Sequence, residues 1–299
     1  MQWSTKLFRI RGIDVRVHAT FALIVALGAT QWGARHGMGG AAFGAAFTLA
    51  LFACVLLHEL GHSLVAQKFG LQVKEIILLP IGGIANLLGK PKHPGQEIAI
   101  ALAGPAVNIL LAGLFGAALW ATGQHLGGAR ALVASAKLPS LSTFLLLLTT
   151  GNLSLALFNL LPVFPLDGGR VLRALLELRW GAVRATVWAA GFGQVAALAL
   201  GGYAVWSGQL FLAFIAAMIF MSAARETAST QLHGPLTQLR AEQLAEMPAV
   251  EFDAHDRIRD AVPSLLRSAQ TAFPVVSGSE VAGVVLRQDL IRAAEQPET

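Results

Sequence analysis

Long apolar runs constrain this chain more than any other feature of its sequence. A helix needs about 20 consecutive apolar residues to cross a bilayer. Runs of roughly that length occupy residues 18–34, 41–66, 98–121, 141–161 and 185–206. A shorter run at 210–224 follows Ser207-Gly208, where the chain can turn so that this run pairs tightly with the one before it. The sequence therefore predicts a polytopic α-helical membrane protein with six transmembrane helices.

The composition agrees with this fold class. Hydrophobic residues make up 55% of the chain and charged residues only 13%, whereas soluble domains carry about 25% charged residues. Lys and Arg outnumber Asp and Glu by 22 to 17, but they gather at the ends of the apolar runs, as they do in membrane proteins. We therefore expect membrane lipid, and no nucleic acid, around these charges. The single cysteine, Cys54, excludes an internal disulfide.

The basic residues also predict the orientation in the membrane. Six helices place both chain termini on one side. If that side is the cytoplasm, it receives Lys6, Arg9, Arg11, Arg16, Lys68, Lys74, Lys90, Lys92, Arg170, Arg173, Arg179 and Arg184. The opposite side receives Arg35, Arg130 and Lys137. Because cytoplasmic loops carry the excess of Lys and Arg, we expect cytoplasmic N- and C-termini. The expected location is the plasma or inner membrane of a prokaryote.

An HExxH motif lies in the second apolar run, at His58-Glu59-Leu-Gly-His62. On a helix this spacing places two imidazoles one turn apart on the same face, where they can bind one zinc ion with the glutamate beside them as a base. The alternative is a helix with two histidines in its core. Three ionisable groups within five residues of an apolar run are costly to place in a membrane. We therefore interpret them as a metal site in the cytoplasmic half of this helix.

A catalytic zinc site needs a third protein ligand and an open position for water. The candidates are Cys54, His93, His125 and Asp167. Cys54 shares the helical face of His58, but ligands at i, i+4 and i+8 on one straight helix would spread over about 12 Å. His93 and His125 lie in predicted loops, and His125 is on the opposite side of the membrane from the motif.

Asp167 stands in the segment Asn159-Leu-Leu-Pro-Val-Phe-Pro-Leu-Asp167-Gly-Gly, at the cytoplasmic end of the fourth run. The two prolines stop a helix and force extended backbone, and the paired glycines allow a sharp turn. A carboxylate here would lower the net charge of a zinc ion otherwise held by two neutral imidazoles. The alternative is a solvated turn aspartate, against which stands the cost of an unpaired carboxylate at the membrane edge.

Two other segments favour strands. Residues 1–16 alternate polar and apolar side chains, which predicts a short interfacial strand pair turning at Gly12 rather than a cleaved signal peptide. Residues 71–87 are rich in β-branched side chains and are broken by a proline and two glycines. Non-helical backbone at membrane depth must be satisfied by protein or by a wet cavity. We expect a re-entrant strand or hairpin that leans over the metal site, with an ordinary interfacial loop as the alternative.

The order of these motifs resembles the site-2 protease family of intramembrane zinc metalloproteases. The resemblance covers residues 1–224 approximately and rests on HELGH, Pro80-Ile-Gly-Gly, Ala103-Gly104-Pro105-Ala-Val-Asn108 and the segment ending in Asp167-Gly-Gly. It implies a metalloprotease that cuts peptide bonds within or near transmembrane segments of other membrane proteins, in regulated intramembrane proteolysis. A non-proteolytic membrane zinc carrier or sensor is the rival hypothesis.

The resemblance also implies roles for individual residues. His58, His62 and Asp167 would bind one zinc ion per chain, and Glu59 would be the catalytic base. A tetrahedral oxyanion needs further donors, and Asn108 and Asn159 are candidates, with interhelical hydrogen bonds as the alternative. The strand that contains Gly82 and Gly83 is a candidate for binding an unwound substrate as an added strand.

The remainder of the chain differs in kind, because charged residues return. Residues 225–247 read as a linker. Residues 248–299 show the pattern strand (249–252), helix (257–269), strand (273–277), strand (281–287), helix (288–294), which resembles one cystathionine-β-synthase (CBS) motif. Such motifs pack in pairs, so we expect this single copy to pair across a homodimer, either as a ligand sensor or as a plain dimerisation tail.

Two departures from the CBS pattern bear on ligand binding. Leu286 occupies a position where nucleotide-binding copies carry Ser or Thr, although Asp289 is present. This departure argues against nucleotide binding. Pro263 would kink the first helix of the module.

Overall fold

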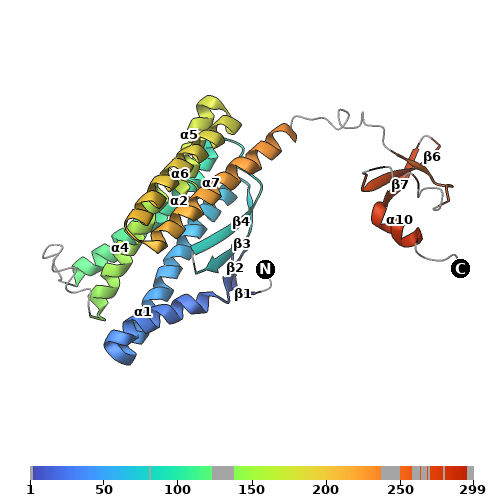
Figure 1. The fold of residues 1–299 in the computed structure, drawn as a ribbon. Helices are drawn as coiled ribbons and strands as arrows, with labels where there is room; N and C mark the ends of the chain where they lie inside the picture. Colours follow the sequence, from blue (N-terminus) through green and yellow to red (C-terminus); the bar gives the residue numbers. More distant parts are fainter. Residues whose placement is uncertain are drawn as a thin grey trace. The chain divides into compact units, whose positions relative to one another are not determined.

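The computed structural model describes residues 3–80, 82–122, 138–236, 250–257, 263, 268, 270–278 and 280–294. The chain divides into two compact units, Met1–Gln231 and Leu232–Thr299, which we describe separately. The first unit combines long helices with a small sheet, and the second is a short α/β unit (Figure 1). The proposed division into a core at 1–224, a linker at 225–247 and a module at 248–299 stays a prediction.

The first helix, α1 (Phe21–Lys68), is a helical hairpin. Its backbone leaves the helical region at His36 and Gly37, and Gly37 has a φ of 63°, which a glycine adopts without strain. The two arms then run back along each other (Figure 1). Phe21 meets Phe52 edge to face, with ring centroids 4.8 Å apart. The arms correspond to the first and second predicted runs.

Four helices of the described part are long and apolar enough to cross a membrane. They are α1, α2 (Pro94–Ala121), α4 (Leu141–Asn159) and α6 (Ala182–Trp206). A further helix, α7 (Leu210–Leu236), packs on α6 through small residues, since an added Cβ at Gly201 would lie 3.6 Å from Ala216. This pairing of α6 and α7 was expected from the turn at Ser207-Gly208.

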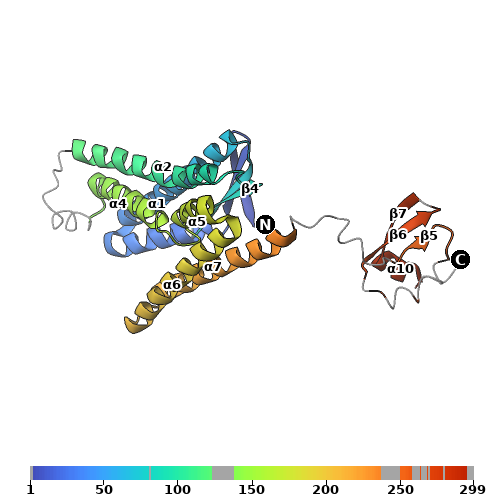
Figure 2. The same cartoon turned by 90° about the horizontal axis from the view of Figure 1, so that it is seen from above.

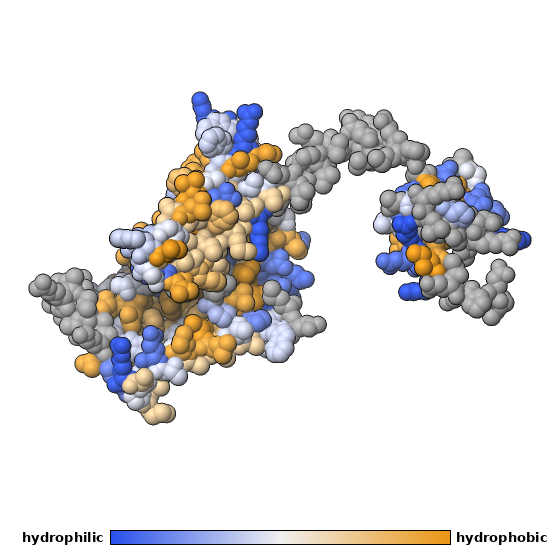
Figure 3. All heavy atoms as spheres, viewed as in Figure 1, coloured by the Kyte–Doolittle hydropathy of each residue, from blue (hydrophilic) through white to orange (hydrophobic). Residues whose placement is uncertain are grey.

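The surface of these helices suits a hydrocarbon environment. Much of the helical surface seen in Figure 3 is hydrophobic. Large apolar side chains such as Leu110, Trp188 and Leu198 are exposed, and an apolar patch of this extent is unusual on a soluble protein. The chain is an integral, multi-pass membrane protein.

Helix α5 (Asp167–Trp180) was not predicted from the sequence. It is short and amphipathic, with charged residues Arg170, Arg173 and Glu177 among leucines. Leu172 and Leu176 pack against Phe164 and the alanines of α6. The arginines of this segment were used above only to predict the orientation in the membrane. In the structure the segment is a helix that packs against α2 and α6.

A four-stranded sheet covers one side of the site-bearing arm of α1. Its strands are β1 (Ser4–Ile10), β2 (Ile13–His18), β3 (Gln72–Leu79) and β4 (Gly82–Leu88), in the order β1-β2-β3-β4. The β1–β2 turn has positive φ at Arg11 (46°) and Gly12 (84°), as type I′ hairpin turns require. Strands β2 and β3 are parallel, whereas β3 and β4 form an antiparallel hairpin. The two predicted strand segments are therefore confirmed as hairpins.

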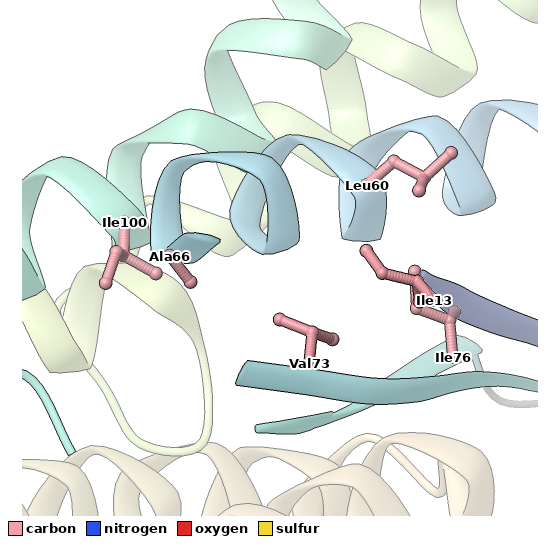
Figure 4. Packing of buried hydrophobic residues seen from close by; sticks show 6 residues of the cluster. All are labelled: Ile13, Leu60, Ala66, Val73, Ile76 and Ile100. Carbon is pink, nitrogen blue, oxygen red and sulfur yellow. The ribbon is translucent and has the colours of Figure 1, made fainter. Parts of the chain in front are cut away.

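A compact apolar cluster fixes the sheet to the helices. Figure 4 shows side chains from β2 and β3 facing those of α1, with α2 beside them. The buried members are Ile13, Leu60, Ala66, Val73, Ile76 and Ile100. Because Leu60 lies between the two histidines of the HExxH motif, this cluster holds the motif in a constant position under the sheet. The view from above shows α1, α2, α4 and α5 gathered on one side of the first unit (Figure 2).

The second unit contains a three-stranded sheet and one described helix. The elements are β5 (Phe252–Asp253), β6 (Ala272–Ser277), β7 (Glu280–Leu286) and α10 (Arg287–Ala294), with strand order β5-β6-β7. Strand β5 is parallel to β6, and β6 is antiparallel to β7. Phe252, Phe273 and Leu290 form its core. Most of the helix predicted at 257–269 lies outside the described residues.

Close packing between the arms of α1 generates a prediction. A Cβ at Gly44 would overlap the backbone of Gly28 and approach Trp32 Cβ to 3.1 Å. We expect Gly44→Ala to lower the stability by about 1–3 kcal/mol, the usual cost of overpacking. The measurement is thermal unfolding of the purified protein in detergent.

The matched control is Gly191→Ala in α6, where an added Cβ meets nothing within 4 Å. Since alanine favours a helix over glycine by about 1 kcal/mol, this variant should melt at the same or a higher temperature. Equal melting temperatures for both variants would contradict the tight hairpin.

Candidate metal centre

The two histidines of the HExxH motif face the same point. His58 and His62 lie one turn apart on the second arm of α1, and their Nε2 atoms are 3.0 Å apart. Both residues are buried, at 6% and 8% exposure. Buried imidazoles need partners for both ring nitrogens. The contacts of each Nδ1 atom therefore decide whether the Nε2 atom of the same ring carries a hydrogen or offers a lone pair.

Both Nδ1 atoms have an acceptor from α2. His58 Nδ1 lies 3.1 Å from Asn108 Oδ1, and His62 Nδ1 lies 2.6 Å from the carbonyl oxygen of Ile100. A carbonyl oxygen can only accept, so His62 Nδ1 carries the hydrogen, and an amide oxygen facing His58 requires the same there. Each neutral imidazole therefore presents a lone pair at Nε2. This arrangement is how outer contacts orient metal-binding histidines.

Asp167 brings a third lone pair to the same point. Its Oδ2 lies 3.3 Å from His58 Nε2 and 3.2 Å from His62 Nε2. This oxygen is buried and accepts no hydrogen bond from a described residue. The three potential ligand atoms all lie within 4.8 Å of one another. Converging lone pairs without hydrogens fit a cation between them, and two imidazoles with one carboxylate are a donor set for catalytic zinc.

The chain brings Asp167 to this place through a tight loop at 160–166. Helix α4 ends at Asn159, before the two prolines, as predicted. Asp167 is the first residue of α5, where a carboxylate interacts favourably with the helix dipole. The prediction of a sharp turn at the paired glycines was wrong, because Gly168 and Gly169 lie inside α5. Their role is close approach: a Cβ on Gly169 would lie 2.6 Å from the backbone of Val163 and Phe164.

Gly104 of α2 lets the backbone of that helix touch both imidazoles. A Cβ there would overlap the His62 ring and lie 2.7 Å from His58 Cε1. Gly61, between the two histidines, meets α2 in the same way, with Ala103 O at 2.9 Å. Neither glycine was among the predicted site residues. The available signal was a glycine inside an apolar helical run, which costs helix stability and so indicates a packing requirement.

Glu59 lies against strand β4. A Cβ on Gly83 would approach Glu59 Cγ to 2.5 Å and Oε1 to 3.4 Å. The glutamate therefore occupies the space that a side chain at position 83 would fill. Gly83 belongs to the edge strand of the sheet, so this edge and the carboxylate of Glu59 are neighbours. Gly82 precedes it with a φ of 138°.

The other residues singled out from the sequence lie apart from the three converging atoms. Cys54 is buried one turn before His58 but does not belong to the cluster of metal-ligating atoms among the described residues. His93 is exposed at the N-terminus of α2. Asn159 is half-buried at the end of α4. His125 lies outside the described residues.

Gly104 provides a test of the metal centre. We expect Gly104→Ala to weaken zinc binding by at least about 10-fold, the usual lower limit when the groups that orient metal ligands are disturbed, because its methyl group would displace both imidazoles. Competition with a chromogenic chelator measures the affinity. Gly113→Ala in the same helix, where a Cβ meets nothing within 4 Å, is the control. Unchanged affinity for Gly104→Ala would place the metal elsewhere.

Known proteins resemble this chain in sequence. The profile described as peptidase family M50 matches residues 46–200. A zinc metalloprotease of Methanocaldococcus jannaschii is 31% identical over 287 residues, covering 95% of this chain and 78% of that protein. Stage IV sporulation protein FB of Bacillus subtilis is 36% identical over 130 residues, covering 43% of this chain and 40% of that protein.

A solved structure agrees with these sequence relatives. The site-2 protease from Methanocaldococcus jannaschii matches with a TM-score of 0.53 and 34% identity, over 75% of this chain and 95% of that chain. His58, His62 and Asp167 supply the ligand atoms that such a zinc enzyme requires. The chain thus belongs to peptidase family M50 and is an intramembrane zinc metalloprotease of the site-2 type.

Proposed function

We propose that this protease hydrolyses peptide bonds within or near the transmembrane segments of other membrane proteins, in regulated intramembrane proteolysis. The observation that supports this proposal is the position of the metal centre. His58, His62 and Asp167 are buried or nearly so within a bundle of apolar helices. A site enclosed by apolar helices of this length favours a substrate that is itself a membrane segment.

Glu59 is the proposed base of the reaction. Zinc, when bound, would polarise the scissile carbonyl and acidify a water molecule. Glu59 stands next to His58 and has its carboxylate against β4, from where it can accept the proton of the attacking water. The same group can return the proton to the leaving amine.

Asn108 and Asn159 are the proposed donors to the developing oxyanion. The Oδ1 atom of Asn108 is committed to His58, but its Nδ2 hydrogens have no partner among the described residues. Asn159 makes no side-chain hydrogen bond to another described residue. The amide hydrogens of Asn108 lie beside a metal ligand, and Asn159 stands at the end of α4, where the loop to Asp167 begins. Amide hydrogens in these positions suit the stabilisation of negative charge on a substrate oxygen.

Strand β4 is the proposed binding site for the unwound substrate. It pairs with β3 on one side and lies at the edge of the sheet on the other. An extended peptide can pair with such an edge through main-chain hydrogen bonds. Gly83 carries no side chain where the strand meets Glu59, so a peptide paired with this edge would run close to the proposed base.

The finer membrane topology also belongs to this proposal. Counting the two arms of α1 separately and including α7 gives six crossing segments with both termini on one side. The charge distribution then supports cytoplasmic termini, and the metal centre would exchange water and products with the cytoplasm.

The second unit is proposed to be a single CBS-like module that pairs with the same module of a second copy. Its order of a parallel and an antiparallel strand pair followed by a helix supports this proposal. Val281, Val284 and Leu286 are exposed on β7, and an apolar edge strand is an unfavourable surface in a monomer. Asp289 lies in the first turn of α10, whereas Leu286 offers no hydroxyl group for a nucleotide.

Replacement of the base tests the proposed function. We expect Glu59→Gln to reduce cleavage of a model transmembrane substrate by about 10²-fold or more, because general base catalysis is lost, while one zinc ion per chain is retained. Comparison of membrane proteomes from cells with the intact enzyme and with Glu59→Gln would reveal uncut substrates. A zinc carrier or sensor would be indifferent to this change.

A second variant tests the placement of the base. Gly83→Ala should displace Glu59 and lower kcat about 10-fold or more, since small displacements of catalytic groups are costly, with zinc affinity unchanged. Leu7→Ala, an exposed position of β1 at the opposite edge of the sheet, is the control. A Gly83→Ala enzyme as active as the control would mean that β4 does not position Glu59.

A further inference from the structure

A forked ion pair joins the helix of the third ligand to the helix that orients the first two. Arg173 of α5 donates through Nη2 to Glu97 Oε2, and its Nε lies 3.1 Å from Glu97 Oε1. Its Nη1 lies 3.2 Å from Glu177 Oε2, one turn further along α5. The side chains of Arg173 and Glu97 are only 20% and 12% exposed. This pair was not among the predicted site residues.

Glu97 lies on the face of α2 that serves the metal centre. That face carries Glu97, the carbonyl of Ile100, Gly104 and Asn108, at spacings of three or four residues. The last three contact the imidazoles of His58 and His62. Residues three and four apart lie above one another on a helix. Glu97 is therefore the N-terminal member of the same row of residues, and the ion pair continues the line of contacts with the imidazoles.

Asp167 depends on α5 for its position. Helix α5 packs against α2 and α6, and Asp167 is its first residue. Arg173 follows six residues later, about 9 Å along the helix axis. The contacts of α5 with α6 are apolar, through Leu172 and Leu176. On the side of α2, the bidentate guanidinium–carboxylate pair adds directional contacts that favour one register of α5 on α2.

We propose that Arg173 and Glu97 are positioning residues that hold α5 in the register on α2 at which Asp167 reaches the two imidazoles. The inference rests on the metal centre of His58, His62 and Asp167. Neither residue of the pair touches the metal. Their effect on the metal passes through the placement of α5, and the planar fork of arginine fixes that placement better than the single point charge of lysine can.

The absorption spectrum of bound cobalt(II) distinguishes the two possible roles of Arg173 and Glu97. It changes if they position Asp167, but not if they only stabilise the fold. In the purified full-length protein, the visible d–d absorption of cobalt(II) reports the ligand set, independently of peptide cleavage. Asp167→Ala gives the reference spectrum of a site that lacks the third ligand. We expect Arg173→Gln and Glu97→Gln to shift the spectrum towards that reference and to weaken zinc binding by about 10–100-fold, the range seen when groups that orient metal ligands are removed.

Matched variants separate the effect of the Arg173–Glu97 ion pair, which we call the clamp, from general effects of charge. Arg179→Gln removes an exposed arginine from the last turn of α5 and should leave both the spectrum and the affinity unchanged. Arg173→Lys keeps the charge but loses the fork, so it should lose affinity to an intermediate degree. It also keeps the test decisive if Arg173→Gln fails to fold. The double variant Glu97→Gln/Arg173→Gln should bind zinc no more weakly than the single variant with the lower affinity, because either change alone already breaks the ion pair.

Two results would overturn the proposal in distinguishable ways. If Asp167→Ala itself leaves zinc affinity and the cobalt spectrum unchanged, the metal centre is wrongly assigned. If Asp167→Ala changes both while Arg173→Gln, Glu97→Gln and Arg173→Lys change neither, the metal centre stands and the clamp is wrong. Losses that simply add in the double variant would also refute it, because they would show two residues that act independently.

Discussion

Three lone pairs meet inside an apolar helix bundle: Nε2 of His58, Nε2 of His62 and Oδ2 of Asp167. Because the hydrogens of both neutral imidazoles are used at Nδ1, a divalent ion between the three atoms would give each of these lone pairs a partner. The three atoms converge because α1 and α5 both pack against α2. Metal binding and helix packing are consequently coupled, as they are in many metal sites.

Different elements supply the metal ligands and the groups that orient them. Helix α1 supplies two ligands and the proposed base, and α5 supplies the third ligand. Helix α2 supplies no ligand, yet it provides the carbonyl of Ile100, the amide of Asn108 and the bare backbone at Gly104. The sheet supplies Gly83 beside Glu59. An amide and a main-chain carbonyl are neutral acceptors, so they orient the imidazoles without placing another charge in the membrane.

Local patterns were sufficient to predict much of this arrangement. The spacing of His58 and His62 fixes their common face on any helix, and Gly12 sits at a turn whose conformation favours glycine. The contributions of α2 could not be read in this way. A main-chain carbonyl such as that of Ile100 has no sequence signature, and Gly104 acquires its role only when another helix lies against it. Helix α5 was missed because its charged face is paired with α2, an interaction between positions 76 residues apart.

The parallel pairing of β2 with β3 has a mechanical consequence for α1. One end of α1 follows β2 and the other end leads into β3, while hydrogen bonds hold these strands side by side. The two ends of the α1 hairpin are thus held next to each other by the pairing of β2 with β3. If its first arm swings outward to admit a substrate, the displacement must be taken up at His36–Gly37, the break inside α1, or transmitted to the sheet. In the second case the displacement passes through β3 to its neighbour β4. Because Gly83 of β4 lies against Glu59, an outward movement of the first arm would then shift the surroundings of Glu59.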